Sequence, residues 1–496
     1  MVGLTAAAVG ARLWRGRHPD LAIDDAWISF RIARTMLEGG GLTFNAGEPP
    51  VEGMTNLLWT LLSATWIAAA PTLDPIGPAR IIGGLCLIAA AALAASLAAR
   101  LSERGGGVGW LAAAGTGAAV AASGSLAYHA ASGLETGLWG LLFVASLTLA
   151  ERAHDGSQRA GLGLGVVLGA LAATRPEGVL IGLCASAVGL KTCGRRALPG
   201  VVTFVVLVGV MELFRLLYYG ELVPNTFHAK PPDPAAGLGY ARDFWLYGLG
   251  GVGVVVYGAL WRAAPASRWL SGLCLLLAAG AIWSGGDWMA GHRRFTAVTW
   301  AGALLAGIAV GRPDSRLLGL VGLLGLVAGP TVSALRQPDA GRTDTEVLAE
   351  IAQRARDSGV RSAALVDIGR FGWVFEGQIY DMVGLTDRHI AHREGGFNEK
   401  AWDEEYFRRF GAELVVIRSE TPIVDPLPHP PVIGHPDQQV LLSILDGGGY
   451  RLRAVASFDA ARHLLVFEAE GRPLPEALWG PVPEKGLRQL LVELHE

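Results

Sequence analysis

The sequence is poor in charged residues. Only 17% of its 496 residues are charged and 51% are hydrophobic, whereas roughly a quarter of the residues in an ordinary soluble domain carry a charge. The net charge is −3, so the chain lacks the basic field with which proteins attract nucleic acid. The shortage of charge therefore argues against a soluble or nucleic-acid-binding protein and favours one that lies in a membrane.

Cysteine is also scarce. The four cysteines lie in or beside apolar runs, and their spacing matches neither a metal site nor a disulfide framework: Cys86, Cys184, Cys193 and Cys274. The glycine triplet at 39–41 lacks the Lys–Ser/Thr ending of a phosphate-binding loop and is interpreted as a helix stop. These absences exclude the commonest metal and nucleotide motifs.

Long apolar runs fill the first two thirds of the chain. A membrane span needs roughly 20 apolar residues, and about eleven are predicted, at 1–14, 80–99, 107–123, 134–150, 160–174, 178–190, 197–217, 243–261, 267–284, 295–311 and 315–336. After "QPDAGRT" the composition becomes that of a soluble protein. We therefore predict a mostly α membrane domain over 1–338 and a soluble α/β or α+β domain over 339–496.

Loop charges predict the orientation. Arg and Lys favour cytoplasmic loops, and five loops carry them, at Arg100/Arg104, Arg152/Arg159, Lys191/Arg195/Arg196, Arg262/Arg268 and Arg312/Arg316. All five share one side whether or not 56–70 crosses the membrane. We prefer a non-crossing 56–70, an interfacial helix in a first outer loop of about 18–79. The soluble domain then also lies outside. The run at 1–14 is only about half a span long, and no basic segment precedes it, which disfavours a cleaved signal peptide.

The predicted outer loops hold most of the unusual polar residues. They read "LAIDDAWISFR", "YHAASGLETG", "TRPEG", "YYGELVPNTFHAKPPDP" and "SGGDWMAGHRRF". Ionisable groups at membrane depth are costly and are therefore functional candidates. A carboxylate can act as general base on a hydroxyl, and basic side chains can hold the phosphate of an anionic lipid. The basic candidates are Arg175, Lys230, Arg293 and Arg294.

Each candidate also has a structural interpretation. Asp24 could cap a helix over 25–38, whose apolar residues recur at helical spacing. "RPEG" could be a turn with an Arg–Glu pair, "GHRRF" could hold snorkelling arginines, and His228 could be a structural hydrogen-bond donor.

The soluble region has a mixed pattern. Residues 345–358 show the spacing of an amphipathic helix, "SAALVDIG", "AELVVIRS" and "HLLVFEA" are typical of buried strands, and a further helix is expected over 399–410. Asp381 and Asp387 are candidate contacts with the membrane domain or with an acceptor molecule, or caps of turns.

Taken in order, these motifs resemble a known family. The long first-loop motif, with "GLET", "RPEG", "YYGELVPNTFHAK", "GGDWM", "RRF" and "DMVGLTD", is similar to the GT-C superfamily of membrane glycosyltransferases and most of all to mycobacterial terminal β-(1→2)-arabinofuranosyltransferases. The resemblance covers about residues 20–395. It implies an enzyme of the bacterial plasma membrane that moves a sugar, such as arabinofuranose, from a polyprenyl phosphate (decaprenylphosphoryl arabinose, for example) to an extracytoplasmic cell-envelope glycan. The implied reaction is a single displacement that inverts the anomeric carbon.

The resemblance also suggests roles for residues. Asp25 is the expected base, and Asp24 would orient the acceptor or bind the sugar. The four basic candidates would hold the lipid phosphate. The remaining expected pocket residues are Glu52, Glu135, Asn225, His228, Asp287, Trp288, Asp381 and Asp387. A divalent cation on the acidic pair is an option that the sequence does not require. The alternatives are a flippase for polyprenyl-linked sugars and a GT-C mannosyltransferase acting on protein or lipid.

Overall fold

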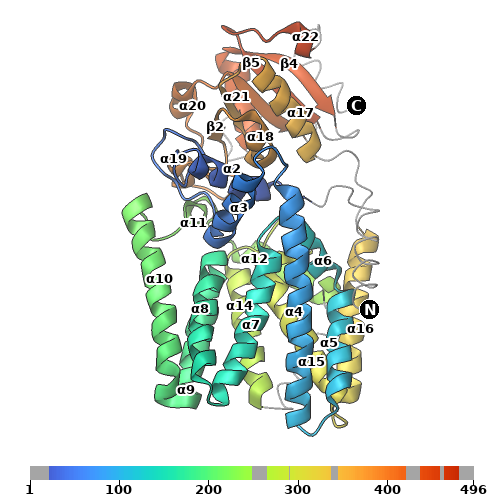
Figure 1. Cartoon of the computed structure of the whole chain (residues 1–496). Coiled ribbons are helices and arrows are strands. Elements are labelled where there is room, and N and C mark those ends of the chain that lie inside the picture. The colour runs from blue at the N-terminus through green and yellow to red at the C-terminus, as the bar shows by residue number, and fades with distance from the viewer. Residues whose placement is uncertain are drawn as a thin grey trace.

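The protein is described from a computed structural model, in which residues 22–248, 265–289, 291–336, 344–419, 436–457 and 463–479 are described. A bundle of long helices carries a smaller domain on one end, and helices α2 (Asp25–Leu37) and α3 (Leu57–Ala69) lie where the two meet (Figure 1). The predicted runs at 1–14 and most of 243–261, and the predicted boundary near 338–342, fall outside the described residues.

The helices of the bundle follow the predicted apolar runs. Their bounds are α4 Ile76–Arg104, α5 Gly109–Ala122, α6 Gly124–Ala131, α7 Thr136–His154, α8 Gln158–Thr174, α9 Glu177–Cys193, η1 Gly194–Ala197, α10 Leu198–Tyr219, α11 Asn225–Ala229, α12 Pro234–Asp243, η2 Phe244–Gly248, α14 Pro265–Trp283, η3 Arg293–Phe295, α15 Thr296–Gly311 and α16 Arg316–Arg336.

Three stretches of the described chain are long and apolar enough to cross a membrane, and the bent pair α5–α6 would make a fourth. They are Ile76–Arg104, Glu177–Tyr219 and Arg293–Gly311. The 29 residues of α4 extend for about 44 Å, more than the roughly 30 Å of a hydrocarbon core. Large apolar side chains are exposed along α10, among them Val206 and Leu217, as expected of a lipid-facing helix. The total of eleven spans stays a prediction.

Small residues allow the helices to pack closely. A Cβ on Gly83 of α4 would collide with the carbonyl of Ala130, and one on Gly165 of α8 with the carbonyl of Gly200 in α10. A larger side chain at either position would push neighbouring backbones apart. The glycine content of this part of the chain therefore reflects close helix–helix contact, as is common in membranes.

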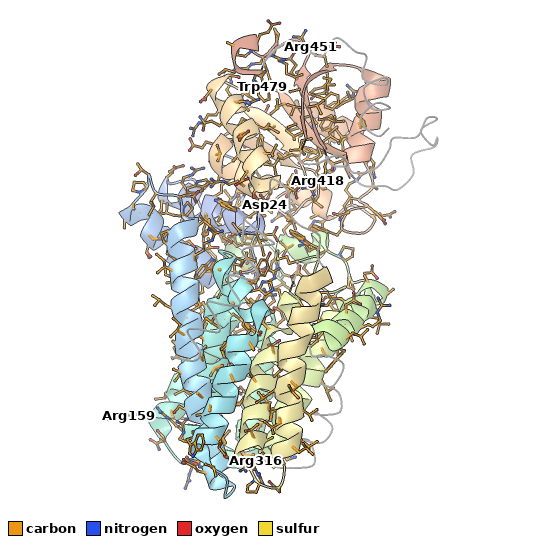
Figure 2. The ribbon with its side chains drawn as sticks, turned by 90° about the vertical axis from the view of Figure 1, so that its right-hand side faces the viewer. Asp24, Arg159, Arg316, Arg418, Arg451 and Trp479 are labelled. Carbon is orange, nitrogen blue, oxygen red and sulfur yellow. The ribbon has the colours of Figure 1, made fainter. Side chains whose placement is uncertain are left out.

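Arginines of the predicted cytoplasmic loops that the structure describes gather at one end of the bundle. Arg104 lies 3.1 Å from Glu151 of α7, and Arg312 approaches Gly105. Arg159 and Arg316 lie at the end opposite Asp24 and the smaller domain (Figure 2). This is the charge asymmetry from which the orientation was predicted.

The smaller domain is built on a five-stranded mixed sheet of order β2-β1-β3-β5-β4. The first three of these strands pair in parallel, whereas β5 is antiparallel to both β3 and β4. The elements are α17 Asp344–Asp357, β1 Ser362–Leu365, α18 Ile368–Phe375, β2 Gln378–Asp381, α19 Arg388–Ala391, α20 Glu404–Phe410, β3 Leu414–Ser419, α21 Pro436–Gly447, β4 Tyr450–Ser457, β5 His463–Ala469 and α22 Glu476–Trp479. The three predicted strands correspond to β1, β3 and β5, and the two predicted helices correspond to α17 and α20.

Helix α2 attaches this domain to the bundle. The buried Arg31 donates from Nη1 to the carbonyl of Gly372 (2.7 Å) and from Nη2 to that of Gly377 (2.6 Å). Its Nε donates to the carbonyl of Phe44 (3.0 Å), and its guanidinium lies over the Phe44 ring. Burying a guanidinium group is costly unless its N–H donors have acceptors. These hydrogen bonds therefore hold the smaller domain against α2.

Candidate functional site

A cavity of about 510 Å³ lies where the bundle meets the smaller domain, which contributes Leu385 to its lining. Its charged lining comes from segments far apart in the sequence: Asp25, Glu52, Glu135, Arg175, Glu177, Glu212, Arg215, Lys230, Arg293 and Arg294. All five predicted outer loops therefore contribute to one site. Apolar side chains such as Met211, Phe227 and Trp283 complete the wall.

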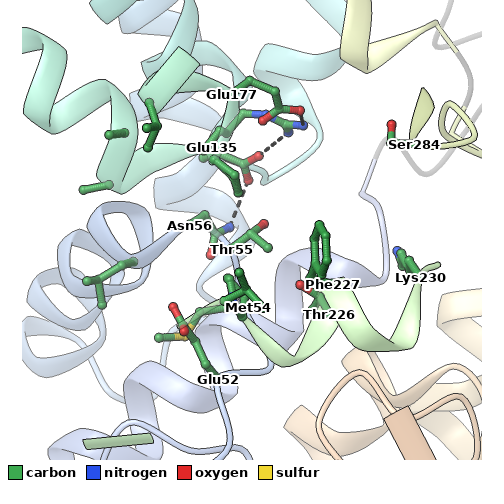
Figure 3. Close-up of a pocket in the computed structure, with 18 of the residues that line it drawn as sticks. Glu52, Met54, Thr55, Asn56, Glu135, Glu177, Thr226, Phe227, Lys230 and Ser284 are labelled. Atoms are coloured by element: carbon green, nitrogen blue, oxygen red, sulfur yellow. Dashed lines mark hydrogen bonds and ion pairs between the residues drawn. The ribbon is translucent and has the colours of Figure 1, made fainter. Parts of the chain in front are cut away.

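One side of the cavity is a chain of hydrogen bonds (Figure 3). Ser29 Oγ donates to Asn56 Oδ1 (2.9 Å), and Asn56 Nδ2 donates to Glu135 Oε2 (2.9 Å). Arg175 donates to Glu135 Oε1 (2.7 Å) and to Glu177 Oε1 (3.0 Å). The Arg–Glu pair considered for "RPEG" exists, and it is part of the cavity wall. Because Arg175 donates hydrogen bonds to two carboxylates, its positive charge is neutralised within the protein.

The other cations of the cavity are held differently. Arg293 Nε donates to Asp287 Oδ2 (2.8 Å), and Arg294 Nη1 donates to Ser284 Oγ (2.7 Å) while its buried Nε has no partner among the described residues. Lys230 follows the short helix α11 and lies across the cavity from Asn56 (Figure 3). Its Nζ lies 4.5 Å from the centre of the Phe397 ring. Burial lowers the pKa of Lys230, and the nearby Asp25 carboxylate opposes that shift.

The two aspartates of the opening motif have different surroundings. Asp25 lines the cavity, and no side chain or backbone N–H of the described residues donates a hydrogen bond to its carboxylate. Burial raises the pKa of Asp25, and the charges of Lys230 and Arg293 act in the opposite direction. A desolvated carboxylate without hydrogen bonds, close to two cations, has the surroundings expected of a general base.

Asp24 does not line the cavity. It is the first residue before α2, yet its side chain does not cap α2. Its two carboxylate oxygens instead accept hydrogen bonds from the backbone N–H groups of Gly369 and Arg370, both at 2.8 Å. These N–H groups belong to the first turn of α18, so Asp24 caps a helix of the other domain. The capping interpretation therefore named the right interaction and the wrong helix.

Several expected pocket residues also have other partners. Glu52 borders the cavity but forms a bidentate pair with Arg215, at 2.6 and 3.1 Å. Asn225 donates from Nδ2 to the carbonyls of Gly384 and Leu385, and His228 stacks on His392. Both lie outside the cavity lining, because α11 uses these side chains to contact the smaller domain.

The remaining four expected residues do not line the cavity. Asp287 accepts the hydrogen bond from Arg293. Trp288 is 66% exposed. Asp381 is buried and accepts hydrogen bonds from the backbone N–H groups of Val383 and Thr386, and Asp387 caps α19 and accepts from Tyr406 Oη (2.8 Å). The two aspartates thus have the turn-capping interactions that were the alternative to glycan contact.

The sequence interpretation did not single out Ser29, Asn56, Arg215 and Ser284. Arg215 carried a visible signal, since "MELFRLLYY" places an arginine inside an apolar run, where charge requires a partner. Ser29 and Asn56 carried no such signal, because small polar residues are common in loops and helices.

Comparisons with known proteins support the resemblance. The chain is 32% identical over 279 residues to the terminal beta-(1->2)-arabinofuranosyltransferase of Mycobacterium tuberculosis, which covers 50% of this chain and 39% of that protein. The chain therefore spans less than half the length of this curated relative. Residues 337–467 match a family described as a domain of unknown function (DUF8728).

The fold matches solved structures over almost the whole chain. ArnT from Cupriavidus metallidurans in the apo state aligns with a TM-score of 0.60 and 13% identity, covering 96% of this chain and 98% of that one. ArnT bound to undecaprenyl phosphate gives 0.60 and 14%, covering 96% and 99%. The oligosaccharyltransferase of Archaeoglobus fulgidus gives 0.52 and 11%, covering 84% and 68%. The predicted helical bundle with a C-terminal sheet domain is thus confirmed, and so is the similarity to an arabinofuranosyltransferase.

Proposed function

We propose that this protein is an integral-membrane glycosyltransferase that moves a sugar from a polyprenyl phosphate to an acceptor hydroxyl in the described cavity. The observation that carries this proposal is the position of Asp25, a partly buried carboxylate that accepts no hydrogen bond from the described residues and lines the same cavity as Lys230 and Arg293. A base and a set of cations in one cavity are what transfer from an anionic lipid requires. The names of the relatives support the same reaction class.

In the proposed step, Asp25 accepts the proton of the acceptor hydroxyl. The oxygen attacks the anomeric carbon of the donor, and the bond from that carbon to the phosphate oxygen breaks. Its electron pair leaves with the polyprenyl phosphate, so one C–O bond forms and one breaks. Attack from the side opposite the phosphate inverts the anomeric carbon.

Lys230 and Arg294 are the best phosphate ligands among the four predicted cations. Lys230 has its Nζ over an aromatic ring, and Arg294 has a buried Nε without a partner in the described chain. Arg293 and Arg175 are paired with carboxylates. We assign these two, with Glu135, to positioning the loops around the donor.

The finer identity rests on the relatives. Similarity to an arabinofuranosyltransferase supports an arabinofuranosyl donor such as decaprenylphosphoryl arabinose, and the ArnT structure with undecaprenyl phosphate supports a polyprenyl-phosphate ligand. We propose a cell-envelope glycan as the acceptor, reached on the extracytoplasmic side of the bacterial plasma membrane. The gathering of arginines at the far end of the bundle supports this orientation.

The experiment is a transfer assay with the purified full chain in lipid nanodiscs. Radiolabelled polyprenyl-phosphate arabinose and mannose are offered with a panel of glycan, lipid and peptide acceptors. We expect the wild type to transfer arabinose from its polyprenyl phosphate and Asp25→Asn to transfer none. Glu38→Gln is the control, at the exposed C-terminal end of the same helix, and should transfer arabinose as the wild type does. Lipid movement across vesicles without sugar transfer would favour the flippase alternative. Equal turnover of Asp25→Asn and wild type would refute the proposed role of Asp25.

A further inference from the structure

A second cluster of reactive side chains lies outside the cavity, where the loop after α10 meets α19. His228 Nε2 is 3.9 Å from Glu221 Oε2, and His392 Nε2 is 4.0 Å from Glu221 Oε1. Ligand atoms of all three residues lie within 4.8 Å of one another, and the two imidazole rings stack with centroids 4.1 Å apart. Two histidines and a carboxylate from two domains thus converge on one point.

Hydrogen bonding leaves the right atoms available for a metal ion. His392 Nδ1 is 2.9 Å from the carbonyl oxygen of Arg388. Because a carbonyl only accepts, Nδ1 carries the hydrogen, and Nε2 of the neutral ring keeps its lone pair. A backbone carbonyl on the second ring nitrogen is the usual support of a metal-bound histidine.

His228 provides an independent observation. Its Nε2 is buried and has no hydrogen-bond partner among the described residues. A buried nitrogen without a partner costs free energy, and a metal ion would supply the missing interaction.

The neighbouring cations have other partners. Arg388 Nε lies 3.7 Å from Glu221 Oε1, but its Nη2 donates to the carbonyl of Tyr219. Lys400 Nζ donates to the carbonyls of His228, Ala391 and Arg393. The other oxygen of Glu221 faces His228, so the carboxylate can contact Arg388 and a metal ion together.

We propose that Glu221, His228 and His392 form a binding site for a divalent transition metal ion of the Zn²⁺ class. Two imidazole nitrogens and one carboxylate oxygen are a donor set that zinc takes in sites with an open fourth position. Ligand atoms at about 2.0–2.1 Å from zinc would be about 3.4 Å apart in a tetrahedral site. The ligand atoms of the three residues all lie within 4.8 Å of one another, so binding requires the distances between them to shorten by at most about 1.4 Å.

The ion would join the two domains beside the cavity. Glu221 and His228 lie on the segment that continues to Lys230, whereas His392 follows α19 of the smaller domain. Lys400 and Asn225 already connect the same segments through carbonyl oxygens. A metal ion adds a cross-link two residues before Lys230 and so restricts the position of that side chain. Metal binding itself does not depend on the proposed sugar transfer.

The test is metal titration of the chelator-treated full chain in nanodiscs, with Co²⁺ absorption as a spectroscopic probe and Zn²⁺ competition against a chromophoric chelator. We expect about one equivalent of Zn²⁺ to bind, and His228→Ala and His392→Ala to weaken binding about 100-fold or more. Glu221→Gln should weaken it about tenfold or more. The control is His389→Ala, which removes a nearby imidazole that contacts Asp403 (3.0 Å) and should bind as the wild type does.

Folding defects are separated from ligand loss by His392→Cys. This variant supplies a thiolate, which zinc also binds, and we expect it to retain Zn²⁺ while His392→Ala does not. Zn²⁺ should also raise the unfolding temperature of the wild type and leave that of His228→Ala unchanged. Wild-type protein that takes up no Zn²⁺, or triad variants that bind it as tightly as the wild type, would overturn the proposal.

Discussion

Asp24 and Asp25 are adjacent in the sequence, yet their carboxylates serve different parts of the molecule. Asp24 accepts the backbone N–H groups of Gly369 and Arg370 in the smaller domain, and Asp25 borders the cavity without a hydrogen bond from the described residues. The start of α2 turns the two side chains apart, because consecutive residues in a helix point in different directions.

The pH dependence of transfer should depend on Asp25. Burial raises its pKa, and the base must be ionised to accept a proton. We therefore expect kcat/KM for transfer to rise with pH and then level off. The rise should lie at a pH above the usual pKa of an aspartate. Asp25→Asn should lose at least about 100-fold in rate at every pH. A wild-type profile that is flat from pH 5 to 8 would count against this assignment.

Asp24 should affect stability more than chemistry. Asp24→Ala leaves two N–H groups of α18 without their acceptor and should lower the free energy of unfolding by about 1–2 kcal/mol. The measurement is thermal unfolding in nanodiscs, alongside transfer at a temperature where the variant is folded. We expect measurable transfer by Asp24→Ala under conditions where Asp25→Asn shows none.

Asp24 should also make stability depend on pH. Burial, with the nearby Asp367 carboxylate, raises the pKa of Asp24 from 3.8 to about 7. The pKa of Asp24 is higher in the folded state than in the unfolded state, so the protonated carboxyl group stabilises the fold. This contribution to the free energy of unfolding is fully present below about pH 4 and is lost as the pH rises through about 7. Asp24→Asn keeps a carbonyl acceptor without the charge, so its unfolding temperature should change less between pH 5 and 8. If the unfolding temperatures of Asp24→Asn and of the wild type changed equally with pH, Asp24 would not be the source of the pH dependence.

Lys230 should determine donor binding. Lys230→Gln removes a buried charge from the cavity, and we expect KM for the polyprenyl-phosphate sugar to rise about 10- to 100-fold, as for loss of a charged hydrogen bond. Lys230→Arg should restore part of the affinity, since both side chains bind phosphate. Lys191→Gln, in the last turn of α9, is the control. The proposed contact would be excluded by an unchanged KM in Lys230→Gln.

The pair of Glu52 and Arg215 should respond unequally to mutation. The side chains of Glu52 and Arg215 are only 5% and 11% exposed, and breaking a buried pair costs about 3–5 kcal/mol. Arg215 also contacts Glu212 (2.6 Å), so Glu52→Gln leaves the guanidinium with a partner. Arg215→Leu leaves Glu52 as an uncompensated carboxylate and should lower the unfolding temperature more. Combining the two substitutions should recover part of that loss, and strictly additive losses would argue against a coupled pair.

Local sequence pattern predicted the elements and the gathering of the loops. Apolar period and length located α4, α7 and α10, and the polar "RPEG" and "RRF" loops contribute to the same cavity. The sequence pattern could not predict which residues far apart in the sequence contact each other. The acceptor role of Asp24 depends on α18, more than 340 residues away, and no spacing rule connects them. Strands β2 and β4 were missed because neither has the continuous apolar run by which the other three strands were located: β2 reads "QIYD" and β4 reads "YRLRAVAS".

Arg31 and Asp24 contact the smaller domain almost entirely through its backbone. Their partners are carbonyl oxygens of Gly372 and Gly377 and the N–H groups of Gly369 and Arg370. Backbone groups are present whatever side chain a residue carries. Three of these four residues are glycines, however, and an added Cβ would collide with the Asp24 backbone at Gly369 and with the Phe44 ring at Gly372. A larger residue at either position would therefore push the smaller domain away from α2.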